Sequence, residues 1–163
     1  MLIVFNGAQT RVYVNINEVL VLDMGYLTTR KKLARVEVEG FAKGPVKLQG
    51  CPSHRIAMTQ DGKEIWLADG HNSRLHVFEV EGDQTKQVAS VKVRDQPGWI
   101  TRRLDGQHAW ASSGEVFDIA SRKLVAVVTD EQDREVGSEK MVEVHWEDGK
   151  PVRCGEQFGY GRE

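Results

Sequence analysis

The sequence has little of what helical, disulfide-stabilised or membrane-spanning proteins require. Its 163 residues include two cysteines and four prolines, and apolar residues hardly ever recur at the spacing of a helix face. No apolar run approaches the ~20 residues needed to cross a bilayer. The apolar start at Met1 ends at Asn6-Gly7 and lacks the basic residues and length of a signal peptide. We therefore expect a β-structured chain with no membrane span.

Charge and metal-binding patterns are also sparse. The 22 basic and 24 acidic residues give a formal charge of −2, so we expect no nucleic-acid partner. The five histidines form no HxH, HxxxH or HExxH pattern, and we expect neither a metal nor another cofactor. Cys51 and Cys154 belong to no CxxC pair. Two interpretations stay open: the two cysteines form a disulfide bridge, or they are separate thiols.

Glycine, in contrast, is abundant, with 16 residues that recur between short β-rich segments. Residues 32–39 alternate apolar and polar side chains, which is typical of a half-exposed strand. Asp61-Gly62 and Asp69-Gly70 separate further strand-like runs, and such pairs favour tight turns. Residues 40–52 are rich in Gly, Lys and Pro and are predicted to form a loop.

The turn pattern repeats along the chain. Asp61-Gly62 and Asp105-Gly106 lie 44 residues apart, and so do Trp66 and Trp110. A period of about 40–45 residues with four strands per unit is typical of a β-propeller. Residues 2–39 follow the same four-strand order, with Tyr13 near the position of Trp66.

These units predict an all-β fold, a partial β-propeller of about three four-stranded antiparallel blades with an extra C-terminal strand. We expect one domain over residues 1–163. Its predicted blades cover approximately residues 2–39, 52–93 and 97–129, and the extra strand covers residues 141–147.

The repeat resembles the YVTN type of β-propeller, which is related to the WD-repeat and quinoprotein-dehydrogenase-like propellers. Residues 11–15 (RVYVN) and 63–69 (KEIWLAD) stand where that repeat has its second strand, and Pro52 and Pro97 stand at unit starts. Gln60 departs from the usual proline before Asp-Gly, and Arg102-Arg103 replaces a Phe-Ser-like pair. The resemblance covers residues 2–146 and implies the C-terminal part of a propeller.

Three units and a fraction cannot close a ring of about 4–8 blades. The sequence is then expected to be a fragment, a truncated homologue, or a chain that self-associates through its open blade faces. The resemblance implies a periplasmic or secreted location for a full-length form, whereas we expect no signal peptide within the sequence given.

Four residues are not explained by the repeat and are the predicted ligand-binding residues. His54 precedes the first strand of its unit, where the resemblance implies the mouth of the central channel. His71 and Arg74 lie on a polar turn that would bind a small anion or a peptide, although turn formation alone explains the Asp and Asn beside them. Trp99 begins its strand and is predicted to face the channel.

No catalytic constellation is recognisable, since the sequence lacks a GxSxG motif and a glycine-rich phosphate loop. The favoured function is a non-enzymatic scaffold that binds a protein partner or a small ligand on its loop or channel face. One alternative is a fragment of a propeller enzyme, either a quinoprotein-like dehydrogenase or a lactonase-like hydrolase. The other alternative is an assembly element that completes a propeller with another chain.

Overall fold

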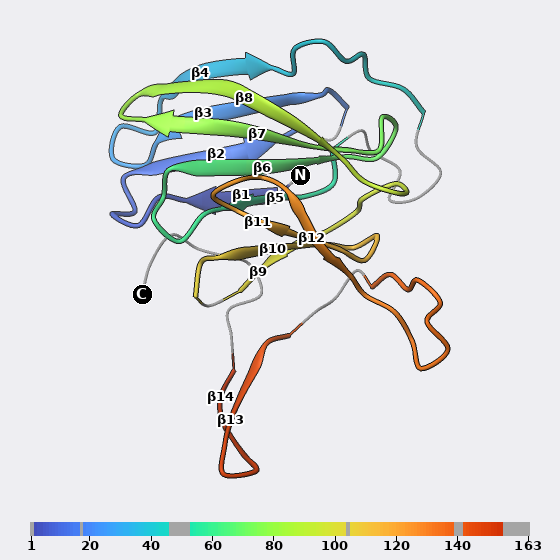
Figure 1. Ribbon diagram of the computed structural model, residues 1–163. Coiled ribbons are helices and arrows are strands. Elements are labelled where there is room, and N and C mark those ends of the chain that lie inside the picture. Colours follow the sequence, from blue (N-terminus) through green and yellow to red (C-terminus); the bar gives the residue numbers. More distant parts are fainter. Residues whose placement is uncertain (1, 17, 46–52, 104, 139–141, 155–163) are drawn as a thin grey trace.

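The computed structural model describes residues 2–16, 18–45, 53–103, 105–138 and 142–154. These residues form strands and no helix, as the sequence predicts, and the strands make four antiparallel sheets. Figure 1 shows the three larger sheets side by side in chain order, with a small hairpin projecting away from them.

Each larger sheet is one blade of four strands in sequence order. Blade 1 contains β1 (Leu2–Phe5), β2 (Arg11–Asn15), β3 (Val21–Tyr26) and β4 (Lys32–Glu37). Blade 2 contains β5 (Ile56–Met58), β6 (Glu64–Asp69), β7 (Arg74–Glu81) and β8 (Gln84–Lys92). Blade 3 contains β9 (Ile100–Arg102), β10 (His108–Ala111), β11 (Glu115–Asp118) and β12 (Leu124–Val127). Strand β1 contacts β5 and β5 contacts β9, so the first strands form the inner edge of an arc.

The strand registers show that the three blades repeat residue by residue. Trp66 pairs with Ala57 and Val77, and Trp110 pairs with Thr101 and Val116. Tyr13 holds the same place in blade 1, between Val4 and Met24. Sequence periodicity therefore identified equivalent positions correctly, including the tyrosine.

Two apolar clusters hold the blades together. The first joins blade 1 to blade 2 through Val4, Tyr13, Leu22, Met24, Ile56, Met58, Ile65, Leu67 and Phe78, among others. The second joins blade 2 to blade 3 and includes Ala57, Trp66, Leu75, Val77, Ile100, Ala109 and Phe117. Because side chains of a strand alternate between its two faces, each of the two clusters uses one face of blade 2. Burial of these two faces is the main stabilisation that the fold offers.

The predicted Asp-Gly turns are present, with one difference in geometry. Only the glycines have positive φ, +71° at Gly62 and +69° at Gly106. The aspartates instead accept backbone hydrogen bonds, Asp61 from the N–H of Lys63 at 3.1 Å and Asp105 from that of Gln107 at 2.9 Å. The carboxylates thus stabilise the turns as Asx-type acceptors.

The C-terminal part also differs from the sequence prediction. The extra strand expected at residues 141–147 is β13 (Val144–Glu147), and it pairs with β14 (Lys150–Cys154), which the sequence did not reveal. Cys154 is an exposed free thiol. Cys51, the other cysteine of the bridge considered above, lies outside the described residues. Within the described ranges, no helix has the length and apolar character that crossing a membrane requires.

Candidate functional site

The predicted ligand-binding residues all lie at one end of the blades. We call this end the loop face, because β5 and β9 begin there and β6 ends there. The backbone N–H of Ala68 donates to the carbonyl of Arg55, and that of Ser112 donates to the carbonyl of Trp99, each at 2.9 Å. His54, Trp99 and the turn that carries His71 and Arg74 are thereby assembled at the same end of neighbouring blades.

His54 and Trp99 come together at the inner edge of the loop face, and their ring centroids lie 6.3 Å apart. The repeat register places Arg55 of blade 2 and Trp99 of blade 3 at equivalent positions, and the guanidinium carbon of Arg55 lies 3.8 Å from the Trp99 ring centroid. Arg55 is 3% and Trp99 7% exposed, whereas His54 is half-buried. His54 is therefore the more accessible member, and the predicted channel-facing Trp99 is mainly a packing residue.

Trp99 is positioned by Ser112, which lies in the connection between β10 and β11. The backbone N–H groups of Gly98 and Trp99 both donate to the Ser112 hydroxyl oxygen, at 2.9 and 3.1 Å. Sequence reasoning named Trp99 but missed Arg55 and Ser112. The 44-residue period could have identified Arg55, because Arg55 stands one period before Trp99 in the sequence.

His71 and Arg74 form a second group, which contacts the segment after blade 1. The His71 Nδ1 atom lies 3.0 Å from the Pro45 carbonyl oxygen, and the Arg74 guanidinium carbon lies 5.6 Å from the Phe41 ring centroid. Asn72 donates from its side-chain nitrogen to the Ala42 carbonyl at 2.9 Å. This turn therefore fastens residues 41–45 to blade 2, and His71 remains exposed beside the contact.

A buried polar network lies directly beneath that turn. His76 and Asp69 are both fully buried, with His76 Nε2 3.0 Å from Asp69 Oδ2 and His76 Nδ1 2.8 Å from the Ser90 hydroxyl. Because the carboxylate only accepts, the network assigns the imidazole proton to Nε2 and lets Ser90 donate to Nδ1. Asn72 donates to the same carboxylate from its backbone and its side chain, at 3.1 and 2.7 Å.

Electrostatics and position together define the role of this network. Burial raises the pKa of Asp69, but the hydrogen bonds from His76 and Asn72 outweigh it, and the pKa lies below the ordinary value. The Ser-His-Asp order is that of a catalytic triad. Its His and Asp are fully buried, however, and the Phe41 ring centroid lies 5.0 Å from that of His76. The network thus stabilises the β6–β7 turn, and local sequence spacing contained no sign of it.

The loop face of blade 3 is hollowed beside Ser112. A cavity of about 370 Å³ is lined by Arg94, Asp95, Gln96, Ser112, Ser113, Gly137 and Ser138. Arg94 donates to Glu135 and to the Ser113 carbonyl. The buried Ser113 hydroxyl has no hydrogen-bond partner among the described residues. The cavity therefore offers hydroxyl, amide and carboxylate groups to a polar ligand.

The residues that the structure describes contain no group of three His, Cys, Asp or Glu side chains placed to hold a metal ion. The sequence assigned no catalytic residue, and the arrangement of the described residues assigns none either.

Comparison with solved structures identifies the fold. The chain is similar to Kuenenia stuttgartiensis hydrazine synthase, with a TM-score of 0.68 and 19% identity over 91% of this chain and 39% of that one. It is similar to the Pseudomonas aeruginosa periplasmic gluconolactonase, with a TM-score of 0.63 and 15% identity over 94% and 41% of the two chains. The Cps50 (Swd1) β-propeller domain of Myceliophteria thermophila gives 0.61 and 13%, over 83% and 44%.

The chain thus has the fold of a partial β-propeller and spans about two fifths of the length of these proteins. No family model and no curated protein matches its sequence. The narrower resemblance to YVTN-type repeats stays a prediction. At identities below 20%, these similarities show a shared fold and no more. Both enzymes and scaffolds occur among the similar solved structures.

Proposed function

We propose that the chain is a non-enzymatic scaffold that binds a polar partner on its loop face, either an acidic protein segment or a small ligand with a carboxylate. His54 contacts the ligand at the inner edge. His71 and Arg74 contact it from the neighbouring turn, and Trp99 holds the inner edge in shape.

The observation that carries this proposal is the polar cavity beside Ser112. Its lining offers the hydroxyls of Ser112, Ser113 and Ser138 and the amide of Gln96, which suit directional hydrogen bonds to a polar ligand, whereas Arg94 in the same lining is paired with Glu135. Arg74 favours an acidic ligand, since among the described residues it has no carboxylate partner and lies against the Phe41 ring. A guanidinium that is not neutralised within the protein attracts carboxylates through charge-assisted hydrogen bonds.

The proposal is tested by capturing partners from the native source with the immobilised chain, in parallel with two single variants. His54→Ala and Gln96→Ala change the loop face. Lys63→Ala is the control, because Lys63 lies in the turn between β5 and β6 at the opposite end of blade 2. We expect a discrete partner or ligand that the wild type and the control retain and that the two loop-face variants lose. Equal capture by all four proteins would refute a loop-face site.

A lactonase assay distinguishes the scaffold from an enzyme. Solved neighbours include the gluconolactonase above and a putative 6-phosphogluconolactonase from Bacteroides fragilis, which has a TM-score of 0.65 and 15% identity over 95% of this chain and 41% of that one. The proposal predicts no turnover of gluconolactone above the uncatalysed rate. Turnover that is lost in the His54→Ala variant would show that the chain is a hydrolase and not a non-enzymatic scaffold.

A further inference from the structure

The connection between β1 and β2 begins at Asn6-Gly7. Asn6 follows β1 as Thr59 follows β5 in blade 2, and the strand registers make the two positions equivalent. The backbone N–H of Asn6 donates to the Arg11 carbonyl at 3.2 Å, and that of Thr59 donates to the Glu64 carbonyl at 2.8 Å. Both residues therefore stand at the base of the same turn, at the end of the blades opposite to the loop face of the proposed scaffold.

Asn6 supports this turn through its side-chain amide. Its Oδ1 atom accepts the backbone N–H groups of Thr10 and Arg11, at 2.9 and 2.8 Å. Its Nδ2 atom donates to the Thr10 hydroxyl oxygen at 3.0 Å. In blade 2 the Thr59 hydroxyl accepts the N–H of Glu64 at 2.8 Å. The turn thus uses an acceptor at this position, and a carboxylate oxygen would serve as well as the amide oxygen.

The side-chain carbon Cγ of Asn6 lies next to an accessible nucleophile. Gly7 is exposed and has no side chain that would crowd its nitrogen, and its N–H donates to no acceptor among the described residues. Addition of this nitrogen to Cγ closes a succinimide ring and places negative charge on Oδ1. The N–H groups of Thr10 and Arg11 stabilise that charge, because preorganised donors favour an oxyanion.

We propose that Asn6 is a site of spontaneous deamidation and that its main product is aspartate. The bond between the Gly7 nitrogen and Cγ forms, and the nitrogen gives its proton to water. The bond between Cγ and Nδ2 breaks, and Nδ2 takes up a proton from water and leaves as ammonia. Water then adds to one of the two ring carbonyls and breaks its bond to the Gly7 nitrogen, which regains a proton. The net change is one water consumed and one ammonia released.

The turn also selects the product. Addition of water at Cγ restores the normal backbone with aspartate, whereas addition at the backbone carbonyl gives isoaspartate, with an extra methylene in the main chain. The side-chain oxygen is held by two N–H donors, and the backbone oxygen of Asn6 by one, the N–H of Gln9 at 2.8 Å. Cγ is therefore the more strongly polarised carbon, and aspartate is favoured. Aspartate retains both acceptor bonds and makes them charge-assisted.

The other described asparagines lack this arrangement. Asn15 is fully buried, away from the water that the reaction consumes. Asn72 donates from Nδ2 to Asp69 at 2.7 Å, and no described group donates to its Oδ1. The neighbouring carboxylate also opposes negative charge on that oxygen. We therefore expect Asn6 to react before either of them.

Mass spectrometry of the full chain tests the proposal. After incubation in a mildly alkaline buffer and tryptic digestion, peptide 1–11 should show the mass change of an amide group exchanged for a hydroxyl group. Peptide 64–74, which contains Asn72, should keep its amide. Gly7 does not have a positive φ, so Gly7→Ala should fold normally, and its methyl group should slow the conversion severalfold. Circular dichroism checks the fold. An unchanged peptide 1–11, or equal rates in wild type and Gly7→Ala, would overturn the proposal.

The product ratio tests the role of the turn. Peptide 1–11 from an Asn6→Asp chain marks the elution of the aspartate product, and isoaspartate is separated from it by chromatography. We expect a higher ratio of aspartate to isoaspartate from the folded chain than from the chain unfolded in guanidinium chloride, since unfolding removes the bonds to Thr10 and Arg11. Equal ratios in the two states would refute selection of aspartate by the turn.

Discussion

Arg55 and Trp99 occupy the same position in consecutive blades, and the guanidinium of Arg55 stacks on the Trp99 ring at 3.8 Å. The stack closes the inner edge between blades 2 and 3, where both side chains are nearly inaccessible. A cation against an aromatic face in a desolvated site contributes about 2 kcal/mol or more. The pair therefore links the candidate site to the stability of the arc.

Trp99→Ala is expected to destabilise the chain by about 3–5 kcal/mol, since it removes a large buried side chain and the ring under Arg55. Trp99→Phe keeps an aromatic face and should cost clearly less. Urea unfolding followed by circular dichroism measures both values. Similar losses in the two variants would show that the stack contributes little beyond packing volume.

Arg102→Met is expected to stabilise the chain. Arg102 takes the position that Met58 holds in blade 2, and it is buried with its Nε and Nη1 atoms unpartnered among the described residues. Burial lowers its pKa to about 9, so it remains charged at neutral pH. Replacement of a buried charge by an apolar residue of similar size gains about 1–4 kcal/mol.

The pH dependence provides a second measurement on Arg102. Its folded pKa of about 9 lies well below the ordinary pKa of an arginine in the unfolded chain, so the unfolded state binds more protons at pH values between the two. Wild-type stability should therefore rise relative to Arg102→Met as the pH increases above about 9, and the advantage of the variant should shrink. A constant difference from pH 7 to 11 would argue against a buried cation.

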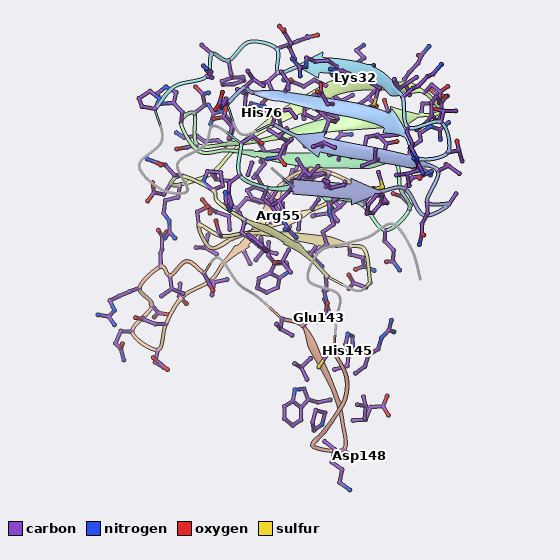
Figure 2. The ribbon with its side chains drawn as sticks, turned by 180° about the vertical axis from the view of Figure 1, so that it is seen from behind. Lys32, Arg55, His76, Glu143, His145 and Asp148 are labelled. Atoms are coloured by element: carbon purple, nitrogen blue, oxygen red, sulfur yellow. The ribbon has the colours of Figure 1, made fainter. Side chains whose placement is uncertain are left out.

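Asp69→Asn is expected to cost about 1–3 kcal/mol at pH 7, because His76 and Asn72 lose a buried charged acceptor. The pKa of Asp69 lies below 3.8 in the folded chain, so its contribution is complete above that value and disappears as the pH falls through the folded pKa. The difference between variant and wild type in thermal unfolding should accordingly vanish in strong acid. Asp148→Asn, at the tip of the hairpin in Figure 2, is the matched control and should have no effect.

Gly114→Ala is expected to disrupt the connection between β10 and β11. Gly114 has φ of +100°, and a Cβ atom there would overlap the carbonyl oxygen of Val136. Gly62→Ala is the control, since its φ is +71° but a Cβ would meet nothing within 4 Å. The control should lose about 1–2 kcal/mol from the backbone alone, and Gly114→Ala should lose about 1–3 kcal/mol more from the overlap. Equal melting temperatures of the two variants would contradict this account.

Much of the fold could be predicted because it depends on local information. Alternation in residues 32–39 and the glycines at Gly62 and Gly106 specify strands and turns through backbone sterics alone. Strand β14 escaped prediction because Pro151 and the glycines near it favour a loop by composition, whereas pairing with β13 makes it a strand.

The sequence by itself determined the period of 44 residues, and with it the four-stranded units and the equivalence of Tyr13, Trp66 and Trp110. Only the tertiary structure decided which polar residues meet. Asp69 and Ser90 converge on His76 because antiparallel pairing brings the end of β6 and of β8 to the start of β7. Arg55 and Trp99 meet because two blades pack face to face, and no local pattern encodes a contact between residues 44 positions apart.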